Sequence, residues 1–360
     1  MDLERRIELV KRKPTEEVIT EEELRQLFQT NERPQHYIGF EISGKVHLGT
    51  GLMTAMKIRD FMEAGVRPII FLADFHTWIN NKLGGDLQRI REVANGYFKH
   101  AFISLGLEEP RVRYVLASEL YDQEYWKRVI QVSKSTTIRR MVRCMTIMGR
   151  REQEAVEAAS MLYPAMQAAD IYTLGIDLAH AGMDQRKVHI LARECADKLK
   201  AKKPVAVHSH LLMGLQQAQR MGYEQNERLD LEISGKMSKS KPESCIYIHD
   251  SEQEIARKIG AAYCPPKAVE GNPIIELCEY IVMRDPKKAL RIERPAKFGG
   301  DIEFASIDEL KKAYAEGKLH PADLKASVAR ELAALLKPSR NYFAKRPELI
   351  RQIEAAEITR

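Results

Sequence analysis

The sequence has few cysteines, and their arrangement excludes two kinds of site. Its 360 residues include five cysteines, at positions 144, 195, 245, 264 and 278, and no Cys-x-x-Cys pair. Because the number is odd and the positions are scattered, neither a disulfide framework nor a structural zinc site is expected. We therefore expect a protein of the reducing cytoplasm that holds no tightly bound metal.

Long apolar runs are missing as well. No stretch of about 18 apolar residues occurs, the length that a membrane-spanning helix needs. The N-terminal segment MDLERRIELVKRKPTEE is charged and lacks the apolar centre of a signal peptide. The net charge of +6 is a mild excess, which permits a polyanionic partner without requiring one. These features predict neither a membrane span nor a secretion signal.

What the first part of the chain does contain is an alternation of strand and helix patterns. Strands are expected at 36–42, 66–75, 113–118, 176–181 and 205–212, and helices at 86–106, about 122–172 and 185–199. Apolar runs such as VRPIIFLADF are typical of strands that are buried on both faces. Strand–helix–strand units of this kind predict an α/β fold with a doubly wound, Rossmann-like parallel sheet.

After about residue 250 the pattern is helical only. Pro321 and Asp323, for example, mark the start of a helix. We expect a sheet domain at 1–232, a connecting segment at 233–250 and a helical C-terminal domain at 251–360. The connecting segment contains SGKMSKSKP (234–242), a short cationic stretch that, taken alone, is best interpreted as a solvated linker.

A glycine-rich turn follows the first expected strand, in YIGFEISGKVHLGTG (37–51). Glycines such as Gly39 and Gly49 allow the backbone to approach a ligand, and the start of the following helix favours an anion. His47 can donate a hydrogen bond to a phosphate. The dinucleotide fingerprint and the P-loop motif are both absent. The turn indicates a phosphate site of another kind, or else an ordinary turn with a surface histidine.

Three polar residues interrupt an otherwise apolar helix pattern in SMLYPAMQAADIYTLG (160–175). Tyr163, Gln167 and Asp170 are spaced so that they share one helix face. A carboxylate, an amide and a phenol in apolar surroundings would suit a small zwitterion, because they can accept hydrogen bonds from an ammonium or hydroxyl group. The alternative is a polar stripe that faces solvent.

Further polar residues follow a later expected strand, in AGMDQRKVH (181–189). Asp184 and Gln185 would lie at the edge of the sheet where ligands bind, with Arg186 and Lys187 adding positive charge beside them. An ordinary helix cap followed by a basic face would have the same sequence. The pattern alone leaves both interpretations open.

Taken together, these segments resemble a known family. HLGT (47–50) and KMSKS (236–240) resemble the HIGH and KMSKS signatures of class I aminoacyl-tRNA synthetases. YIGFE, YPAMQAADIYTLGID and GMDQRK are similar to the substrate-binding segments of the tyrosyl-tRNA synthetases of archaea and eukaryotes. The resemblance runs from about Thr15 to Phe343 and implies a class I catalytic domain followed by a helical anticodon-binding domain. The nearest alternative is a tryptophanyl enzyme; a non-catalytic RNA-binding descendant and a cofactor adenylyltransferase are more distant ones.

The resemblance implies that the chain forms tyrosyl adenylate from tyrosine and ATP, with Mg²⁺ accompanying the ATP, and then charges tRNA(Tyr). Tyr37 and Asp170 would bind the phenol hydroxyl. The ammonium group of tyrosine would be held by three residues, Tyr163, Gln167 and Gln185.

For ATP, the implied residues fall into two groups. Asp184 would contact the ribose, and the nucleotide pocket would also include Gly39, Glu41, Gly49, Met237 and Ser238. The catalytic groups at the phosphates would be His47, Thr50, Lys236 and Lys239. Thr50 stands where the family signature has its second histidine, so this position has a shorter reach.

For tRNA, the resemblance assigns residues in both halves of the chain. Arg186 and Lys187 would approach the end of the acceptor stem. Phe298 and His320 would enclose the first anticodon base, to which Asp323 would hydrogen-bond. The resemblance also implies a homodimer formed through a helical insertion near 122–160.

Overall fold

The computed structural model describes residues 1–149, 157–223, 226–239 and 241–357. Its backbone contacts divide the chain into two compact units. Unit 1 comprises residues 1–45, 55–210 and those from Pro347 on, whereas unit 2 comprises 46–54 and 211–346. Both units are therefore assembled from separate segments, in contrast to the continuous ranges 1–232 and 251–360 expected from the sequence.

Unit 1 is built on a six-stranded sheet with the order β1-β6-β5-β2-β3-β4 among the described residues. The strands are β1 (Thr15–Ile19), β2 (Gln35–Phe40), β3 (Arg67–Leu72), β4 (Arg113–Leu116), β5 (Leu178–Gly182) and β6 (Val205–Ser209). Strands β2 to β6 are parallel, and β1 pairs antiparallel with β6. The chain moves from β2 outward to β4 and then returns to β5 on the other side of β2. This reversal is the point at which open α/β sheets bind ligands, and the predicted doubly wound fold is confirmed.

Strand β1, which the sequence did not predict, is less buried than the predicted strands β3 and β6. β6 is buried throughout and β3 at every residue except Arg67, as expected of strands covered on both faces. β1 has the sequence TEEVI and is only partly buried, because it lies at the edge of the sheet. Edge strands tolerate charged residues, so β1 carries no apolar run that would have predicted it.

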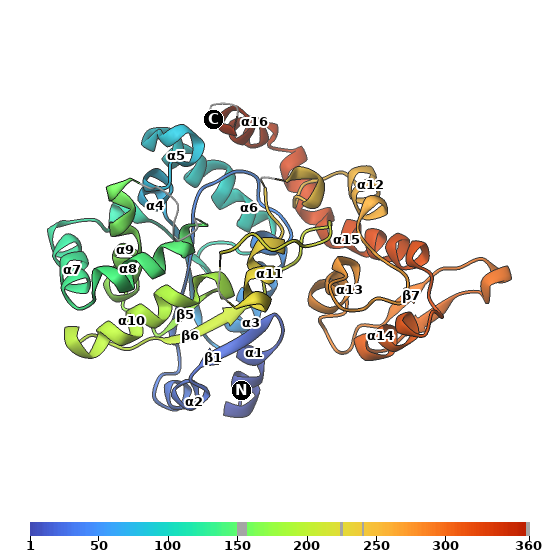
Figure 1. Cartoon of the computed structure of the whole chain (residues 1–360), viewed down its shortest axis with the longest axis horizontal. Coiled ribbons are helices and arrows are strands. Elements are labelled where there is room, and N and C mark those ends of the chain that lie inside the picture. The colour runs from blue at the N-terminus through green and yellow to red at the C-terminus, as the bar shows by residue number, and fades with distance from the viewer. Residues whose placement is uncertain (150–156, 224–225, 240, 358–360) are drawn as a thin grey trace. The chain divides into compact units, whose positions relative to one another are not determined.

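Helices pack around this sheet (Figure 1). Those of unit 1 are α1 (Leu3–Lys11), α2 (Glu21–Thr30), α3 (Thr54–Glu63), α4 (Asp74–Ile79), α5 (Leu87–Val93), α6 (Lys99–Ser104), α7 (Gln123–Lys134), α8 (Ile138–Cys144), α9 (Tyr163–Thr173), α10 (Arg186–Leu199) and α16 (Pro347–Glu357). The helical stretch expected at 122–172 is divided into α7, α8 and α9. Residues 150–156 of the expected insertion lie outside the described residues.

The helix expected at 86–106 is interrupted at Gly96, between α5 and α6. Gly96 has non-helical angles (φ −86°, ψ −108°), and Gln352 of α16 fills the resulting gap. The Tyr97 N–H donates to Gln352 Oε1 (2.9 Å), and Gln352 Nε2 donates to the Glu92 carbonyl (3.1 Å). A Cβ at position 96 would overlap Gln352 Oε1, so any larger residue there would displace the Gln352 amide. Figure 1 shows α16 beside α5 as a result.

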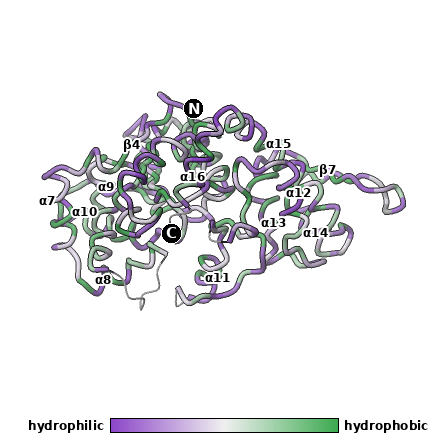
Figure 2. Tube along the Cα trace, turned by 90° about the horizontal axis from the view of Figure 1, so that it is seen from above, coloured by the Kyte–Doolittle hydropathy of each residue, from purple (hydrophilic) through white to green (hydrophobic). Residues whose placement is uncertain are grey.

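Unit 2 is mostly helical. Its helices are α11 (Glu227–Gly235), α12 (Glu252–Ala261), α13 (Pro273–Leu277), α14 (Ile307–Ala315) and α15 (Pro321–Ala344), and it also has a hairpin of β7 (Leu290–Ile292) and β8 (Ile302–Phe304). The sequence did not predict these short strands. The loop that joins them projects from the rest of unit 2 and is mainly hydrophilic (Figures 1 and 2).

Candidate active site

Helix α9 carries the three predicted polar residues of the tyrosine site in unit 1. Tyr163, Gln167 and Asp170 are buried, with 5%, 9% and 0% of their surface exposed. The alternative of a solvent-facing stripe is therefore wrong. Gln167 Nε2 donates to Gln185 Oε1 (3.4 Å), which brings together two residues predicted to hold the ammonium group.

Residues at the carboxyl end of β2 adjoin this stripe. Tyr163 donates through its hydroxyl to Glu41 Oε1 (2.7 Å). The ring of buried Tyr37 folds over Gly39, where a Cβ would lie 2.5 Å from the Tyr37 hydroxyl. Burial, and then the charge of Asp170, raise the pKa of Tyr37 well above its usual value. Tyr37 consequently remains a hydrogen-bond donor at neutral pH.

Asp170 has partners that the sequence interpretation missed. Its Oδ1 accepts hydrogen bonds from the hydroxyls of Tyr121 (3.1 Å) and Tyr125 (2.9 Å). His76 approaches from α4, with its Nε2 atom 3.6 Å from Asp170 Oδ2. The available signal was position, because His76 follows β3 and Tyr121 follows β4, both at the ligand edge of the sheet.

Burial controls the ionisation of this cluster. The pKa of Asp170 is raised well above its usual value by burial, while the hydroxyls of Tyr125 and Tyr121 act in the opposite direction. Burial also lowers the pKa of His76 to about 3, so its imidazole is neutral at pH 7. A neutral imidazole has one N–H donor and one acceptor nitrogen.

The HLGT turn and the cationic segment come together in unit 2. His47 is 4% exposed and pairs with Tyr247 in a short antiparallel bridge, while the Leu48 N–H donates to the Ile246 carbonyl (3.0 Å). The Gly49 N–H donates to His47 Nδ1 (3.2 Å). Burial, followed by the charges of Lys239 and Lys236, lowers the pKa of His47 to about 3. Neutral His47 therefore carries its proton on Nε2, where it can donate.

The cationic segment is anchored rather than free along its length. Ser234 and Gly235 end α11, and Lys236 forms a bridge with Met213. The Met237 N–H donates to the Leu212 carbonyl (2.7 Å), and the Met237 side chain is 3% exposed. The buried Met237 side chain therefore anchors the segment to the rest of unit 2. Ser240 lies outside the described residues.

Thr50 and Ser238 are the remaining predicted phosphate-site residues of unit 2. Thr50 Oγ1 accepts from the His47 N–H at 3.4 Å, a long bond. The Ser238 carbonyl accepts from the Lys241 N–H (3.1 Å), which closes a turn around Lys239. HLGT and KMSKS belong to one structural cluster, because the charges of Lys239 and Lys236 act on the pKa of His47. The two motifs lie far apart in the sequence.

The segment after β5 places its predicted residues in the short 3₁₀ turn Met183–Gln185, which contains Asp184, and at the start of α10. Arg186 bonds to Glu17 through Nε (2.8 Å) and Nη2 (2.9 Å), and the pKa of Glu17 falls to about 2 because of His208 and Arg186. Lys187 donates to Thr146 Oγ1 (3.1 Å). Both cations have protein partners, and their predicted contact with tRNA stays a prediction.

The regions around Phe298 and His320, which were predicted to contact the anticodon, are joined by Arg294. The sequence interpretation did not single out this arginine. Arg294 donates to the Gly300 carbonyl (2.8 Å) and to the Lys318 carbonyl (3.1 Å). Exposed His320 caps α15 by accepting the Ala322 N–H (3.1 Å), and Asp323 lies in the first turn. The side chain of Phe298 lies outside what the structure describes.

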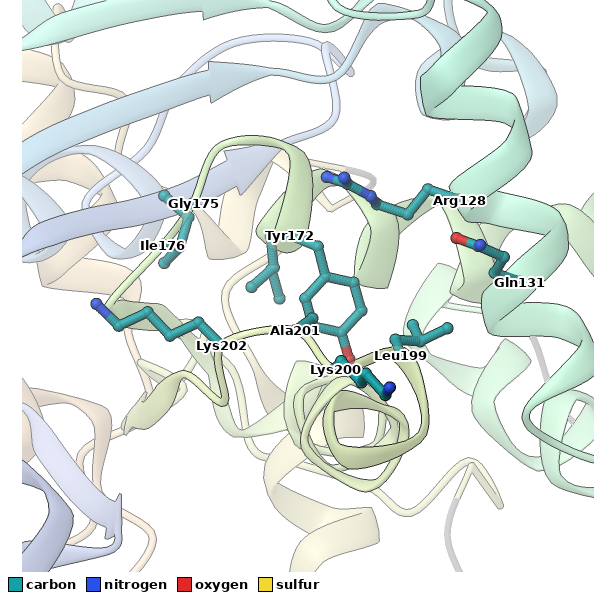
Figure 3. A pocket seen from close by; sticks show the side chains of 10 residues that line it. Arg128, Gln131, Tyr172, Gly175, Ile176, Leu199, Lys200, Ala201 and Lys202 are labelled. Atoms are coloured by element: carbon teal, nitrogen blue, oxygen red, sulfur yellow. The ribbon is translucent and has the colours of Figure 1, made fainter.

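A cavity of about 230 Å³ lies elsewhere in unit 1, near the C-terminal ends of α9 and α10 (Figure 3). Arg128, Lys200 and Lys202 surround the ring of Tyr172 there. Lys202 is paired with Asp177, and Arg128 donates to Thr173. None of the predicted site residues lines this cavity, so it is separate from the predicted tyrosine site.

A comparison with family models defines the class of protein. The model described as tRNA synthetases class I (W and Y) matches residues 29–337. This match agrees with the doubly wound sheet and with the clustering of HLGT and KMSKS. The chain therefore belongs to the class I aminoacyl-tRNA synthetases, in the tryptophan and tyrosine branch.

Individual relatives narrow the assignment. The tyrosine–tRNA ligase of Thermococcus kodakarensis is 51% identical, with 100% of both chains covered. The crystal structure of tyrosyl-tRNA synthetase from Pyrococcus horikoshii, complexed with L-tyrosine, matches with a TM-score of 0.93 and 49% identity over 99% of this chain and 100% of that one. The chain belongs to the tyrosine–tRNA ligases, as predicted.

The tryptophanyl alternative is not favoured. The tryptophanyl-tRNA synthetase of Aeropyrum pernix matches with a TM-score of 0.68 but only 18% identity, covering 92% of this chain and 84% of that one. At this identity the likeness shows a common fold and nothing further.

Proposed function

We propose that this chain activates L-tyrosine with ATP and transfers it to the 3′ end of tRNA(Tyr). In the first step the tyrosine carboxylate attacks the α-phosphorus of ATP and pyrophosphate leaves. In the second step a hydroxyl of the terminal ribose attacks the adenylate carbonyl, and AMP leaves. The observation that supports tyrosine as the substrate is the buried carboxylate of Asp170, whose Oδ2 has no hydrogen-bond partner among the described residues.

Unit 1 supplies the tyrosine contacts in this proposal. Asp170 accepts from the phenol hydroxyl and Tyr37 donates to the phenol oxygen. The oxygens of Tyr163, Gln167 and Gln185 accept from the ammonium group. A site that is built to hydrogen-bond a hydroxyl rejects the analogue without it, and tyrosyl enzymes are themselves the standard instance of this rule.

Stabilisation of the phosphates is assigned to the HLGT–KMSKS cluster of unit 2. Phosphoryl transfer needs positioning and charge stabilisation more than covalent help from the protein. His47 Nε2–H and the Thr50 hydroxyl donate to phosphate oxygens, and Lys236 and Lys239 balance the charge of the departing pyrophosphate. The proposed nucleotide contacts also include Gly39, Glu41, Gly49, Asp184, Met237 and Ser238.

Mg²⁺ enters with ATP as part of the substrate. Among the residues that the structure describes, no three His, Cys, Asp or Glu side chains gather as ligands for a metal ion. The triphosphate oxygens therefore provide the ligands in this proposal, and the ion neutralises charge that develops during transfer.

Unit 2 also carries the proposed anticodon contacts. Phe298 and His320 enclose the first anticodon base and Asp323 bonds to it, while Arg186 and Lys187 of unit 1 approach the acceptor end. We further propose a homodimer through the insertion near 122–160. Ile130 of α7 and Ile138 of α8 support it, because they are 60% and 76% exposed, which is unusual for large apolar side chains.

The cytoplasm is the proposed compartment. All five cysteines are free thiols, as a reducing compartment favours. Of the helices described, none combines the length and hydrophobicity that a membrane span requires.

Tyrosine-dependent exchange between ATP and pyrophosphate tests the proposed function. The Asp170→Ala variant should lose at least about 10-fold in kcat/KM for tyrosine, because the buried acceptor of the phenol hydroxyl is lost. Its KM for ATP should stay close to that of the wild type. Asp197→Ala, which removes an exposed carboxylate of α10, should change neither value. An equal loss for tyrosine and ATP would contradict the assignment, and exchange driven by tryptophan would overturn the function.

A further inference from the structure

The Asp170 carboxylate is held from one side only. Oδ1 receives two hydroxyl hydrogen bonds, at 2.9 Å from Tyr125 and 3.1 Å from Tyr121. Oδ2 is equally buried and has no hydrogen-bond partner among the described residues. Because an unpaired buried carboxylate oxygen is costly, this asymmetry indicates an oxygen reserved for a ligand.

The two tyrosines are themselves rigidly placed. Their rings stack with centroids 3.9 Å apart and planes inclined by 16°, and Trp126 packs edge-on against both. Asp122 caps α7 by accepting the Tyr125 N–H (2.8 Å). The Tyr125 hydroxyl also lies 3.2 Å from the Met166 carbonyl, one turn before Asp170 on α9. These contacts fix both hydroxyls relative to the helix that carries the carboxylate.

His76 also belongs to the hydrogen-bond network around Asp170. Its Nδ1 lies 3.3 Å from the Tyr121 oxygen, and its ring meets Tyr163 edge-to-face with centroids 4.5 Å apart. Tyr121 has one hydroxyl proton, which is donated to Asp170. We therefore assign the imidazole proton of His76 to Nδ1, from which the Tyr121 oxygen accepts, so that Nε2 is an acceptor.

In the ionised form of Asp170, which the hydroxyls of Tyr125 and Tyr121 favour, two buried acceptors face each other. His76 Nε2 and Asp170 Oδ2 lie 3.6 Å apart, and neither has a hydrogen-bond partner in the described part of the chain. Two lone pairs at this separation repel unless a donor approaches them. The single proton of an O–H group meets this requirement when both acceptors share it, whereas a C–H group leaves both acceptors unpaired.

We propose that Tyr121 and Tyr125 are positioning residues for Asp170, and that His76 joins Asp170 as a second acceptor. The cluster then selects an amino acid whose ring ends in a hydrogen-bond donor. This inference rests on the proposed function, in which Asp170 meets the phenol hydroxyl of tyrosine. It adds three residues outside the motif segments to those that determine the specificity for tyrosine. They are His76 of α4, Tyr125 of α7 and Tyr121 just before α7.

The test compares tyrosine with phenylalanine in ATP–pyrophosphate exchange. Tyr121→Phe and Tyr125→Phe each remove one hydroxyl and keep the ring. Each should lower the ratio of kcat/KM for tyrosine to that for phenylalanine by about 10-fold, because a buried hydrogen bond that holds the Asp170 carboxyl is lost. The change should lie in the KM for tyrosine, while the KM for ATP stays constant. His76→Phe should lower the same ratio.

A double-mutant cycle shows whether Tyr125 acts through Asp170. In an Asp170→Asn background, adding Tyr125→Phe should cause little further loss of discrimination, because interacting residues are not additive. Tyr172→Phe is the matched control: it removes another buried hydroxyl of α9, which donates to the Ala192 carbonyl and not to Asp170. It should leave the ratio unchanged.

The outcomes separate the inference from the proposed function. Equal losses for tyrosine and phenylalanine in Tyr125→Phe, or additive effects in the cycle, would overturn the positioning role and indicate a purely structural one. An unchanged ratio in His76→Phe would remove the second acceptor. If the wild type shows no tyrosine-dependent exchange at all, the proposed function fails before the inference is tested.

Discussion

At the scale of single residues, burial determines which groups can donate and which can accept. His47 is neutral at physiological pH because burial and two lysines lower its pKa to about 3. Its one N–H is on Nε2, since Nδ1 accepts from Gly49. A neutral donor can bind phosphate without adding a permanent charge, so the positive charge at the proposed phosphate site comes from Lys236 and Lys239.

The proposed role of Lys236 in adenylate formation can be measured separately from tyrosine binding. Lys236→Ala should lower the rate constant of adenylate formation by about 10-fold or more, because it removes charge stabilisation of the leaving pyrophosphate. Pre-steady-state activation assays measure this rate constant. The KM for tyrosine in the exchange assay should be nearly unchanged. Lys241→Ala is the control, an exposed lysine of the same segment. A large rise in the KM for tyrosine would argue against a transition-state role for Lys236.

Residues of the proposed tyrosine site could be predicted where a polar side chain stood out against apolar neighbours, as Asp170 does in α9. Tyr121 and Tyr125 gave no such contrast, since aromatic residues before and within an amphipathic helix usually belong to the core. His76 was likewise indistinguishable from a core histidine. Their role depends on three elements meeting at one carboxylate, and helical spacing does not encode that.

At the scale of elements, the interruption between α5 and α6 is the feature that sequence periodicity could not show. The apolar pattern continues through Gly96, so it predicts one helix. The break exists because Gln352, more than 250 residues later, supplies the hydrogen bonds that the interrupted backbone lacks. A glycine inside a helical pattern was the one local sign.

Gly96→Ala should destabilise the protein by about 1–3 kcal/mol, because the new methyl group overlaps the Gln352 amide and breaks its two hydrogen bonds. Thermal unfolding followed by circular dichroism measures the effect. Gly260→Ala is the matched control, since a Cβ in α12 meets open space and alanine favours a helix. The cost of Gly96→Ala should shrink in a Gln352→Ala background, and an undiminished cost there would exclude Gln352 as its cause.

At the scale of the whole molecule, the fold class was predictable and the division of the chain was not. Apolar strands and helical periodicity sufficed for an α/β domain followed by helices. The hairpin β7–β8 escaped prediction because three-residue strands carry too little pattern. The assignment of 46–54 to unit 2 depends on contacts with residues such as Ile246 and Tyr247, which the local sequence does not indicate.

The proposed recognition of tRNA can be separated from adenylate formation with Asp323→Ala. This variant should weaken aminoacylation of tRNA(Tyr), by about 10-fold in kcat/KM, because a base contact is lost, and it should leave adenylate formation unchanged. Asp308→Ala removes the equivalent first-turn carboxylate of α14, which controls for helix stability. Impaired adenylate formation in Asp323→Ala would move this residue out of the anticodon site.

The contact between α16 and the Gly96 break also has a consequence for the order of synthesis. Unit 1 receives its last helix only after residues 211–346 have been translated. Until α16 emerges from the ribosome, the Tyr97 amide and the Glu92 carbonyl lack the partners that Gln352 provides. The hydrogen bonds at the Gly96 break therefore form only after residues 211–346 of unit 2 have been made.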